Sequence, residues 1–482
     1  MSLIKSGAAL AFARLANQAV MFIGPIILVR LISVYDYGIY REFFVYATIA
    51  GIIGSAAVNR SLLYLLPKHP DSERQLVALS TLFVMFSSLI VALSVFGIDR
   101  FTELFSGFEF GLEVAIYLIV FLNFDYVECY WLVKNQIRKV IIYTLVRSAA
   151  RLLAVVGAAY YYGDAATIIW SLIAVESIRL FYVVLSTLFA RSNFRDRVRQ
   201  SGIAREQLVF FSPLAIMASL ETVNVNLGQL IVSDELGEEA LAFYFVGSYA
   251  ILIASLLYSS VSDLLFPKVV GAMSDNSFES LTPWRQMTNF YVAFMLAVTA
   301  LGFVHANEII GLLFSDKYLA AAPVFQVLIF GTLILSFDFN FVIRTLNKNT
   351  NSLVGYLILI PINLGISYAL IAEHGLLAPA YAYLLAQACL TIYLGWRVIL
   401  LTKLSFLQLF DWSQLSRISL AFLGSIAVLV MYTRFAGAEG LIHAIISSVL
   451  FLAVYLLLLG LVGFNALNYF GKQFGANVTT EI

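Results

Sequence analysis

The chain has 482 residues, of which 61% are hydrophobic and 12% are charged, and its mean hydropathy is +0.91. This composition excludes a soluble globular protein and indicates a polytopic membrane protein. The net charge of zero gives no reason to expect a nucleic-acid partner. A helix needs about 20 residues to cross the hydrocarbon layer, so the apolar content suffices for roughly 14 crossings.

Apolar runs separated by short polar breaks predict an all-α fold of fourteen membrane-spanning helices. The expected spans are 7–31, 39–66, 76–97, 111–133, 140–162, 165–190, 208–232, 240–266, 285–304, 320–346, 351–372, 376–401, 417–434 and 441–463. The expected segments are a six-helix lobe at 1–190, a basic linker at 191–207, a second six-helix lobe at 208–401, an interfacial segment at 402–416, two further helices at 417–463 and a tail at 464–482.

The first two predicted helices form a hairpin with a turn at 35–38, and this hairpin is unusually rich in cations. Its charged residues are four arginines and one acid: Arg14, Arg30, Arg41, Arg60 and Glu42. Two of the arginines lie beside the turn, while Arg14 and Arg60, with Asn17 and Asn59 as polar neighbours, lie toward the opposite end. An uncompensated cation inside a membrane is by default a functional-site hypothesis.

A guanidinium binds phosphate groups through charge-assisted hydrogen bonds. We therefore expect the four arginines and the two asparagines to line the path of an anionic, lipid-linked substrate, with one rung of arginines at each end of the hairpin. The alternative is that the arginines extend to the membrane interfaces and only anchor the helices. The sequence leaves both interpretations open.

The fourth to sixth predicted helices also carry charge, but here the signs balance. The charged residues are Asp125, Glu128, Arg147, Arg151, Glu176 and Arg179. Turns near residues 137 and 163 place these side chains at matching depths. An unpaired charge in this position would cost several kcal/mol, so we predict a structural ion-pair network that fixes helix packing. The alternative is that these charges form part of a conducting site.

The lysines and arginines of the loops fall almost entirely on one side of the predicted membrane. Most of them, including five arginines of the 191–207 linker, share this side, whereas the other side receives only Arg100, Lys317 and Arg434. Short cytoplasmic loops are enriched in basic residues. We therefore predict that both termini and the linker are cytoplasmic.

A weak internal repeat relates the two predicted lobes. The second helix ends Leu-Leu-Pro-Lys at Lys68 and the eighth ends Leu-Phe-Pro-Lys at Lys268, with six helices between them. An even number of helices predicts parallel halves, an arrangement that transporters use for alternating access.

Individual polar residues stand out in the second lobe. Glu221 and Asn224 lie three apart in the seventh helix, and Asp338 and Arg344 form a candidate packing pair in the tenth. Glu221 is a candidate to bind a coupling proton or sodium ion or to hydrogen-bond sugar hydroxyls. The alternative is a protonated carboxyl that bonds to a neighbouring helix. The histidines show no metal-ligand spacing, so no metal or cofactor is expected.

Two motifs resemble one transporter family. Arg30-Leu31 followed by Asp36-Tyr37-Gly38 and Tyr40 is similar to a turn motif of O-antigen and polysaccharide flippases of the multidrug/oligosaccharidyl-lipid/polysaccharide (MOP) exporter superfamily. The stretch 308–314 followed by Lys317, Tyr318 and Ala321 is similar to the segment before the tenth helix of that family.

The resemblance implies a two-lobe transporter of the bacterial inner membrane, not an enzyme, that flips an undecaprenyl-pyrophosphate-linked oligosaccharide. It also implies membrane lipids, a glycan polymerase and a chain-length regulator as partners. A multidrug/cation antiporter of the same fold is the nearest alternative, but such exporters should carry spare acids where this chain carries spare arginines. A membrane glycan polymerase or ligase is disfavoured because no outer loop exceeds about 15 residues.

Overall fold

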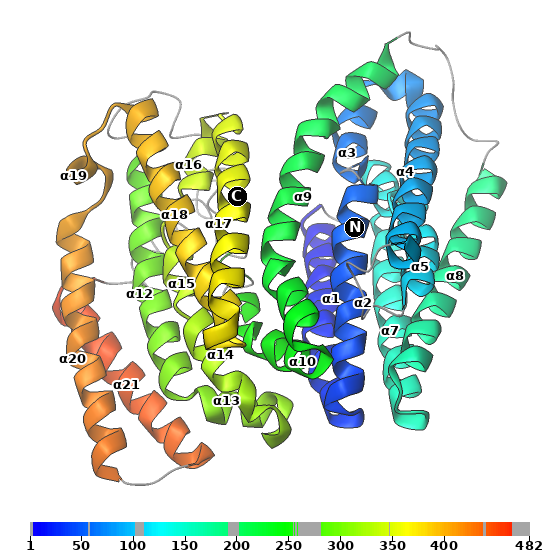
Figure 1. The fold of residues 1–482 in the computed structure, drawn as a ribbon. Helices are drawn as coiled ribbons and strands as arrows, with labels where there is room; N and C mark the ends of the chain where they lie inside the picture. The colour runs from blue at the N-terminus through cyan, green and yellow to red at the C-terminus, as the bar shows by residue number, and fades with distance from the viewer. Residues whose placement is uncertain are drawn as a thin grey trace. The chain divides into compact units, whose positions relative to one another are not determined.

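The computed structural model describes residues 3–55, 58–101, 110–190, 202–253, 281–346, 348–436 and 440–464, together with residues 255 and 258 (Figure 1). Every regular element in these ranges is a helix. Of the expected segments, residues 191–201 of the linker and 465–482 of the tail lie outside the described residues.

The chain divides into two compact units, Met1–Phe243 and Tyr244–Ile482. The first unit contains α1 (Leu3–Leu31), α2 (Val34–Ser55), α3 (Val58–Lys68), η1 (Pro70–Ser72), α4 (Glu73–Phe101), α5 (Gly111–Leu122), α6 (Val127–Val133), α7 (Ile137–Tyr161), α8 (Ala165–Ala190) and α9 (Ile203–Leu236). Helix α10 (Glu238–Gly247) runs across the division. The expected lobe boundaries at 190 and 208 stay a prediction.

The second unit continues with shorter pieces before its long helices. These are α12 (Thr282–Val304), α13 (Ala306–Phe314), η5 (Asp316–Ala321), α14 (Ala322–Leu328), α15 (Gly331–Leu335), α16 (Phe339–Thr345), α17 (Thr350–His374), α18 (Leu377–Thr402), α19 (Phe406–Leu409), α20 (Trp412–Ala436) and α21 (Leu441–Leu461).

Twelve stretches of the described residues are long and apolar enough to cross a membrane. Two of the expected fourteen spans are not among them. The span expected at 111–133 forms two shorter helices, α5 and α6. The span expected at 240–266 is described only in part, by α10 and a few residues after it.

The first hairpin turns earlier than we expected. Tyr35–Gly38, predicted as the turn, belongs to α2, which begins at Val34. The reason is a local cap, because the Ser33 hydroxyl accepts a hydrogen bond from the backbone N–H of Asp36 at 2.9 Å. A serine in this position satisfies one of the first donors of a helix, and here it starts α2 five residues before the predicted residue 39.

The break between α5 and α6 is stabilised by a side chain from another helix. Phe124 adopts a left-handed backbone conformation with φ of 59°. The carbonyls that end α5 accept hydrogen bonds from the Arg179 guanidinium of α8, at 2.9 Å for Phe121 and 3.2 Å for Asn123, and Val120 is a third acceptor. Backbone groups inside a membrane must find partners within the protein. Arg179 therefore makes the interruption possible.

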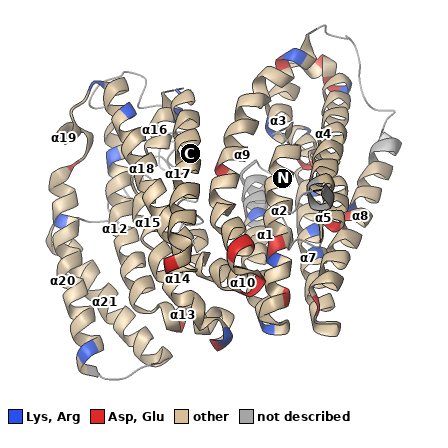
Figure 2. Ribbon diagram, in the orientation of Figure 1, with Lys and Arg blue, Asp and Glu red and all other residues tan. Residues whose placement is uncertain are grey.

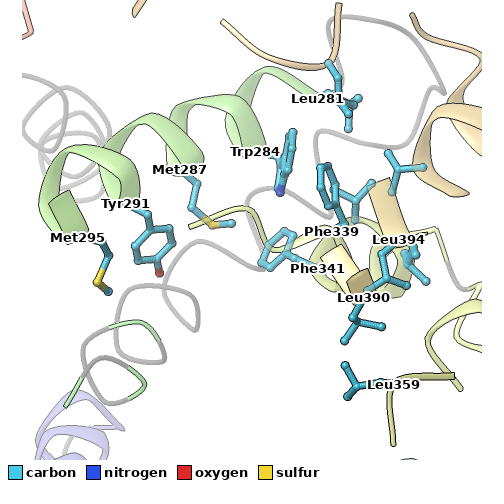
Figure 3. Packing of buried hydrophobic residues seen from close by; sticks show 14 of the residues in the cluster. Leu281, Trp284, Met287, Tyr291, Met295, Phe339, Phe341, Leu359, Leu390 and Leu394 are labelled. Atoms are coloured by element: carbon cyan, nitrogen blue, oxygen red, sulfur yellow. The ribbon is translucent and has the colours of Figure 1, made fainter. Parts of the chain in front are cut away.

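The largest core of the second unit lies between α12, α16, α17 and α18 (Figure 3). Trp284, Tyr291 and Phe341 are fully buried there. Asp338 caps α16 by accepting a hydrogen bond from the backbone N–H of Phe341 at 3.1 Å. The predicted packing pair is confirmed, since an Arg344 nitrogen lies 3.6 Å from the Asp338 carboxylate.

The carboxy-terminal helices α20 and α21 pack on α12 through a second core. Buried alanines of α12, including Ala293 and Ala297, contact Phe451 and Tyr455 of α21 within this cluster. The Tyr455 hydroxyl donates a hydrogen bond to the Ala293 carbonyl at 2.8 Å. The small side chains of α12 leave room for the rings of Phe451 and Tyr455 in this cluster.

Candidate functional site

The four hairpin arginines differ in exposure and in contacts. Arg14, Arg30 and Arg60 are exposed, whereas Arg41 is half-buried and donates a hydrogen bond to Gln229 of α9 at 3.4 Å. Arg14 and Arg60 make no hydrogen bond or ion pair with another residue that the structure describes. Two exposed guanidinium groups thus remain available to a ligand at helical positions.

The two asparagines predicted beside these arginines lie in different surroundings. Asn17 accepts a hydrogen bond from the Ser148 hydroxyl at 2.5 Å, which ties α1 to α7. Asn59 is half-buried on α3. Asn17 therefore has a packing contact in addition to the substrate contact that we predicted for it, and that predicted contact stays a prediction for both residues.

The motif residues Asp36 and Gly38, which the structure places in the first turns of α2, make contacts to the backbone of other helices. Asp36 accepts a hydrogen bond from the backbone N–H of Ala165, at the start of α8, at 3.2 Å. A Cβ atom at Gly38 would lie 2.0 Å from the carbonyl oxygen of Glu238, so only glycine allows α2 to approach α10 this closely. These motif residues hold helices together.

Five of the six charges predicted as a network form ion pairs around Glu176, whose side chain is fully buried. Figure 2 marks the basic and acidic positions along the helices. Arg147 binds both Glu176, at 3.1 Å, and Asp125, at 2.7 Å. Arg179 lies 2.7 Å from Glu176. Arg151 is the most distant of the three arginines, with 3.6 Å between its Nε and Glu176. That these pairs serve only to fix packing stays a prediction.

Glu128 does not join these ion pairs within the described part of the chain. Its carboxylate accepts a hydrogen bond from the Thr144 hydroxyl at 2.8 Å. The interruption after Leu122 explains the difference, because it reorients α6 relative to a continuous helix through 111–133. Without Glu128, the ion-paired group contains three arginines and two carboxylates, so its charge does not cancel as the sequence suggested.

The network adjoins the first two helices. The Phe43 ring of α2 lies 5.4 Å from the Tyr117 ring of α5, whose hydroxyl contacts Arg151. The bond between Ser148 and Asn17 joins α7 to α1 one residue after Arg147. The two regions that sequence analysis separated are therefore neighbours in the first unit.

Two aromatic residues of α5 contact the arginines of the network, and sequence analysis did not single them out. The Tyr117 hydroxyl accepts a hydrogen bond from Arg151 at 3.3 Å. The Phe121 ring has the Arg147 guanidinium 5.1 Å and the Arg151 guanidinium 5.7 Å from its centroid. Aromatic faces attract guanidinium groups in this way. An aromatic residue in an apolar helix gives no sign of such a role in the sequence.

Helix α9 contacts α3 and α4 with its first turns. Glu206 lies 2.6 Å from Lys68, and the buried Gln207 side chain donates to Ser61 at 3.2 Å and to Ser80 at 2.8 Å. The paired rings of Phe210 and Tyr64 stack with centroids 4.6 Å apart. This end of α9 is thus fixed to the end of α3 that carries Lys68.

The last turns of α9 contact α2. The Ser233 hydroxyl donates a hydrogen bond to the buried Glu42 carboxylate at 2.5 Å, one turn beyond the Gln229 contact with Arg41. Between the two ends of α9, Glu221 is exposed and Asn224 is buried, with 1% of its surface exposed. Their proposed part in ion coupling or sugar contact stays a prediction.

In the described part of the chain no group of three or more histidine, cysteine, aspartate or glutamate residues could hold a metal ion. The buried His305, just after α12, contacts Ser447 of α21 at 2.9 Å and lies 3.9 Å from Glu308. Burial lowers the pKa of this imidazole below its ordinary value, and the nearby Glu308 carboxylate opposes that shift.

Comparison with known proteins finds similarity to proteins of polysaccharide biosynthesis. The family described as "Polysaccharide biosynthesis protein" matches residues 27–323. Capsular polysaccharide biosynthesis protein CapF of Staphylococcus aureus is 26% identical over 189 residues, which are 38% of this chain and 47% of that protein. The match therefore spans about half the length of this relative.

Solved structures of transporters share the fold. Lipid II flippase MurJ, in an inward closed conformation, has a TM-score of 0.66 at 14% identity, over 93% of this chain and 98% of MurJ. An inward-facing multidrug resistance transporter of the MATE family, in the MOP superfamily, has a TM-score of 0.60 at 12% identity, over 82% of this chain and 99% of that one. At such identities the likeness establishes the fold alone.

Proposed function

Since the chain belongs to the polysaccharide biosynthesis protein family and has the fold of MurJ and MATE transporters, we propose that it is a flippase for an oligosaccharide linked to undecaprenyl pyrophosphate. The oligosaccharide would be an O-antigen or exopolysaccharide repeat unit, moved across the bacterial inner membrane by alternating access. The proposed topology has fourteen crossings, namely the twelve candidate spans, the interrupted α5–α6 pair and the span that begins with α10.

The charge of the first unit supports this proposal most directly. The six spans expected between residues 7 and 190 contain seven arginines and five carboxylates. These residues are Arg14, Arg30, Arg41, Arg60, Arg147, Arg151 and Arg179 against Glu42, Glu113, Asp125, Glu128 and Glu176. An excess of two positive charges in spanning segments suits an anionic headgroup such as a pyrophosphate.

The same charge argues against the alternative functions. A cation-coupled multidrug antiporter of this fold would bind cations and would need spare carboxylates, whereas these helices hold spare arginines. A glycan polymerase or ligase would need a reaction site, and the family and fold matches are to polysaccharide biosynthesis proteins and transporters. Transport of a lipid-linked anion therefore accounts for more of the observations.

Within this proposal the four hairpin arginines bind the substrate at two sides of the membrane. Arg14 and Arg60, together with Asn17 and Asn59, would receive the pyrophosphate at the cytoplasmic side, and Arg30 and Arg41 would contact it at the outer side. The exposure of Arg14 and Arg60 supports the first assignment. Arg41 already contacts Gln229, so substrate release there would accompany changes at α9.

The remaining parts of the proposal concern energy and partners. Glu221, exposed on α9 near Asn224, would bind a coupling proton or sodium ion or contact the sugars. Both termini would be cytoplasmic, and the two lobes of six helices would move relative to each other. A glycan polymerase and a chain-length regulator would act on the flipped product.

A complementation assay tests the proposal. In a strain that lacks this gene, the wild-type chain should restore surface glycan, whereas Arg14→Ala and Arg60→Ala should not, at equal protein level in the membrane. Arg397→Ala is the matched control, because Arg397 lies in the second unit and bonds to Asn351 at 2.7 Å. Normal surface glycan with both Arg14→Ala and Arg60→Ala would contradict the proposed binding site.

A further inference from the structure

The ion pairs around Glu176 contain one more arginine than they need. Glu176 is fully buried, and its two carboxylate oxygens lie 3.2 and 3.1 Å from Nε and Nη2 of Arg147. The Arg179 Nε lies 2.7 Å from the same carboxylate. Two guanidinium groups in these close contacts already satisfy a single carboxylate. The third, Arg151, is not required to neutralise Glu176.

The contacts of Arg151 are also the weakest of the three. Its Nε lies 3.6 Å from Glu176, and its hydrogen bond to the Tyr117 hydroxyl measures 3.3 Å. The side chain of Arg151 is 28% exposed, against 14% for Arg147 and 5% for Arg179. Arg151 can therefore exchange its partners for a ligand, whereas the other two cannot do so without leaving buried carboxylates or carbonyls unpaired.

The surroundings of Arg151 suit a phosphate group. The centroid of the Phe121 ring lies 5.7 Å from the Arg151 guanidinium carbon, within the range of a cation–π contact. Tyr117 provides a hydroxyl beside it. A guanidinium and a phenol beside it are donors that a phosphate group accepts from.

We infer that Arg151 is a pyrophosphate-binding residue of the transport path and not a member of the structural ion pairs. This inference rests on the proposed function. Arg147 and Arg179 keep Glu176 and Asp125 paired in every step, and Arg151 moves from Glu176 and Tyr117 to the substrate's phosphates. The transport path thereby gains a binding position in addition to the two rungs of the first hairpin.

Binding of a pyrophosphate lipid to the purified full-length protein tests this assignment. The probe is farnesyl pyrophosphate, titrated by intrinsic fluorescence, with farnesol as the uncharged control. Arg151→Gln should fold like the wild type and bind farnesyl pyrophosphate roughly tenfold more weakly, with farnesol binding unchanged, because one charge-assisted hydrogen bond is lost. Arg151→Lys should retain part of the affinity. Arg147→Gln should instead reduce the yield of folded protein.

Two outcomes would overturn the inference. Arg151→Gln could bind farnesyl pyrophosphate as tightly as the wild type, or it could lose folded protein to the same extent as Arg147→Gln, which would make it a structural residue. If affinity falls in Arg14→Ala and Arg60→Ala but not in Arg151→Gln, only this inference fails. If the wild-type protein does not distinguish farnesyl pyrophosphate from farnesol, the proposed recognition of the anion fails with it.

Discussion

Replacing Arg179 tests whether the interrupted helix α5–α6 depends on a side chain of α8. The guanidinium bonds to the carbonyls of Val120, Phe121 and Asn123 and pairs with Glu176, and only 5% of the side chain is exposed. Arg179→Met keeps most of the side-chain volume but removes every donor. Glu176 retains Arg147, so the main loss is at the end of α5, where three carbonyls lose their partner.

The expected loss is about 3–5 kcal/mol in the free energy of unfolding, the usual cost of removing one partner from a buried pair. It can be measured by unfolding the detergent-solubilised protein with SDS. Arg151→Met is the matched control, and its unfolding free energy should stay within about 1 kcal/mol of the wild type, because its contacts are long and partly solvated. Equal unfolding free energies for Arg179→Met and the wild type would refute the role of Arg179 at the helix interruption.

Three other predictions follow from the charged residues. Asp125→Arg should lower the yield of folded protein by repelling Arg147, and the added change Arg147→Asp should partly restore it; transport lost at full protein level would instead place Asp125 in the transport path. Glu221→Gln should weaken the dependence of transport on a proton or sodium gradient, and an unchanged dependence would exclude Glu221 as the coupling site. Burial lowers the pKa of His305 in the folded protein below the ordinary value of about 6.5, which the unfolded chain retains. At a pH between the folded and the unfolded pKa, the unfolded chain therefore binds more protons than the folded protein. Thermal stability should therefore fall as the pH drops below about 6.5, and less so in His305→Asn, whereas the same pH dependence in both proteins would assign the effect to other groups.

Hydropathy predicts most of the helices because a membrane-spanning helix is defined by its own length and composition. It fails where a distant residue determines the backbone. The interruption after Leu122 depends on Arg179, which is far away in the sequence, so the span expected at 111–133 shows no break on inspection. The early start of α2 at Val34 had a local cause, the Ser33 cap, and could have been recognised from the serine and the aspartate three residues later.

Counting residues from the predicted turns also identifies charges that lie at the same depth in the membrane. The count works because a nearly straight helix rises about 1.5 Å per residue. It placed Asp125 level with Arg147 and Arg151, and Arg151 level with Glu176. In the structure Asp125 pairs with Arg147, and Arg151 lies within ion-pair distance of Glu176. The count could not say which way each side chain points around its helix. Glu128, three residues after Asp125, therefore entered the predicted network, although it bonds to Thr144.

The position of Glu128 outside the ion pairs removes the contrast in net charge between the first hairpin and the network. With Glu128 included, the network is neutral and its arginines need no ligand; without it, three arginines share two carboxylates and one cation is in excess. A transported anion can favour one conformation only if its contacts differ between conformations. Arg147 and Arg179 cannot supply that difference, because releasing them would leave buried acids or carbonyls without partners. Arg151 can supply it, since its long contacts to Glu176 and Tyr117 are those most easily exchanged for phosphate oxygens.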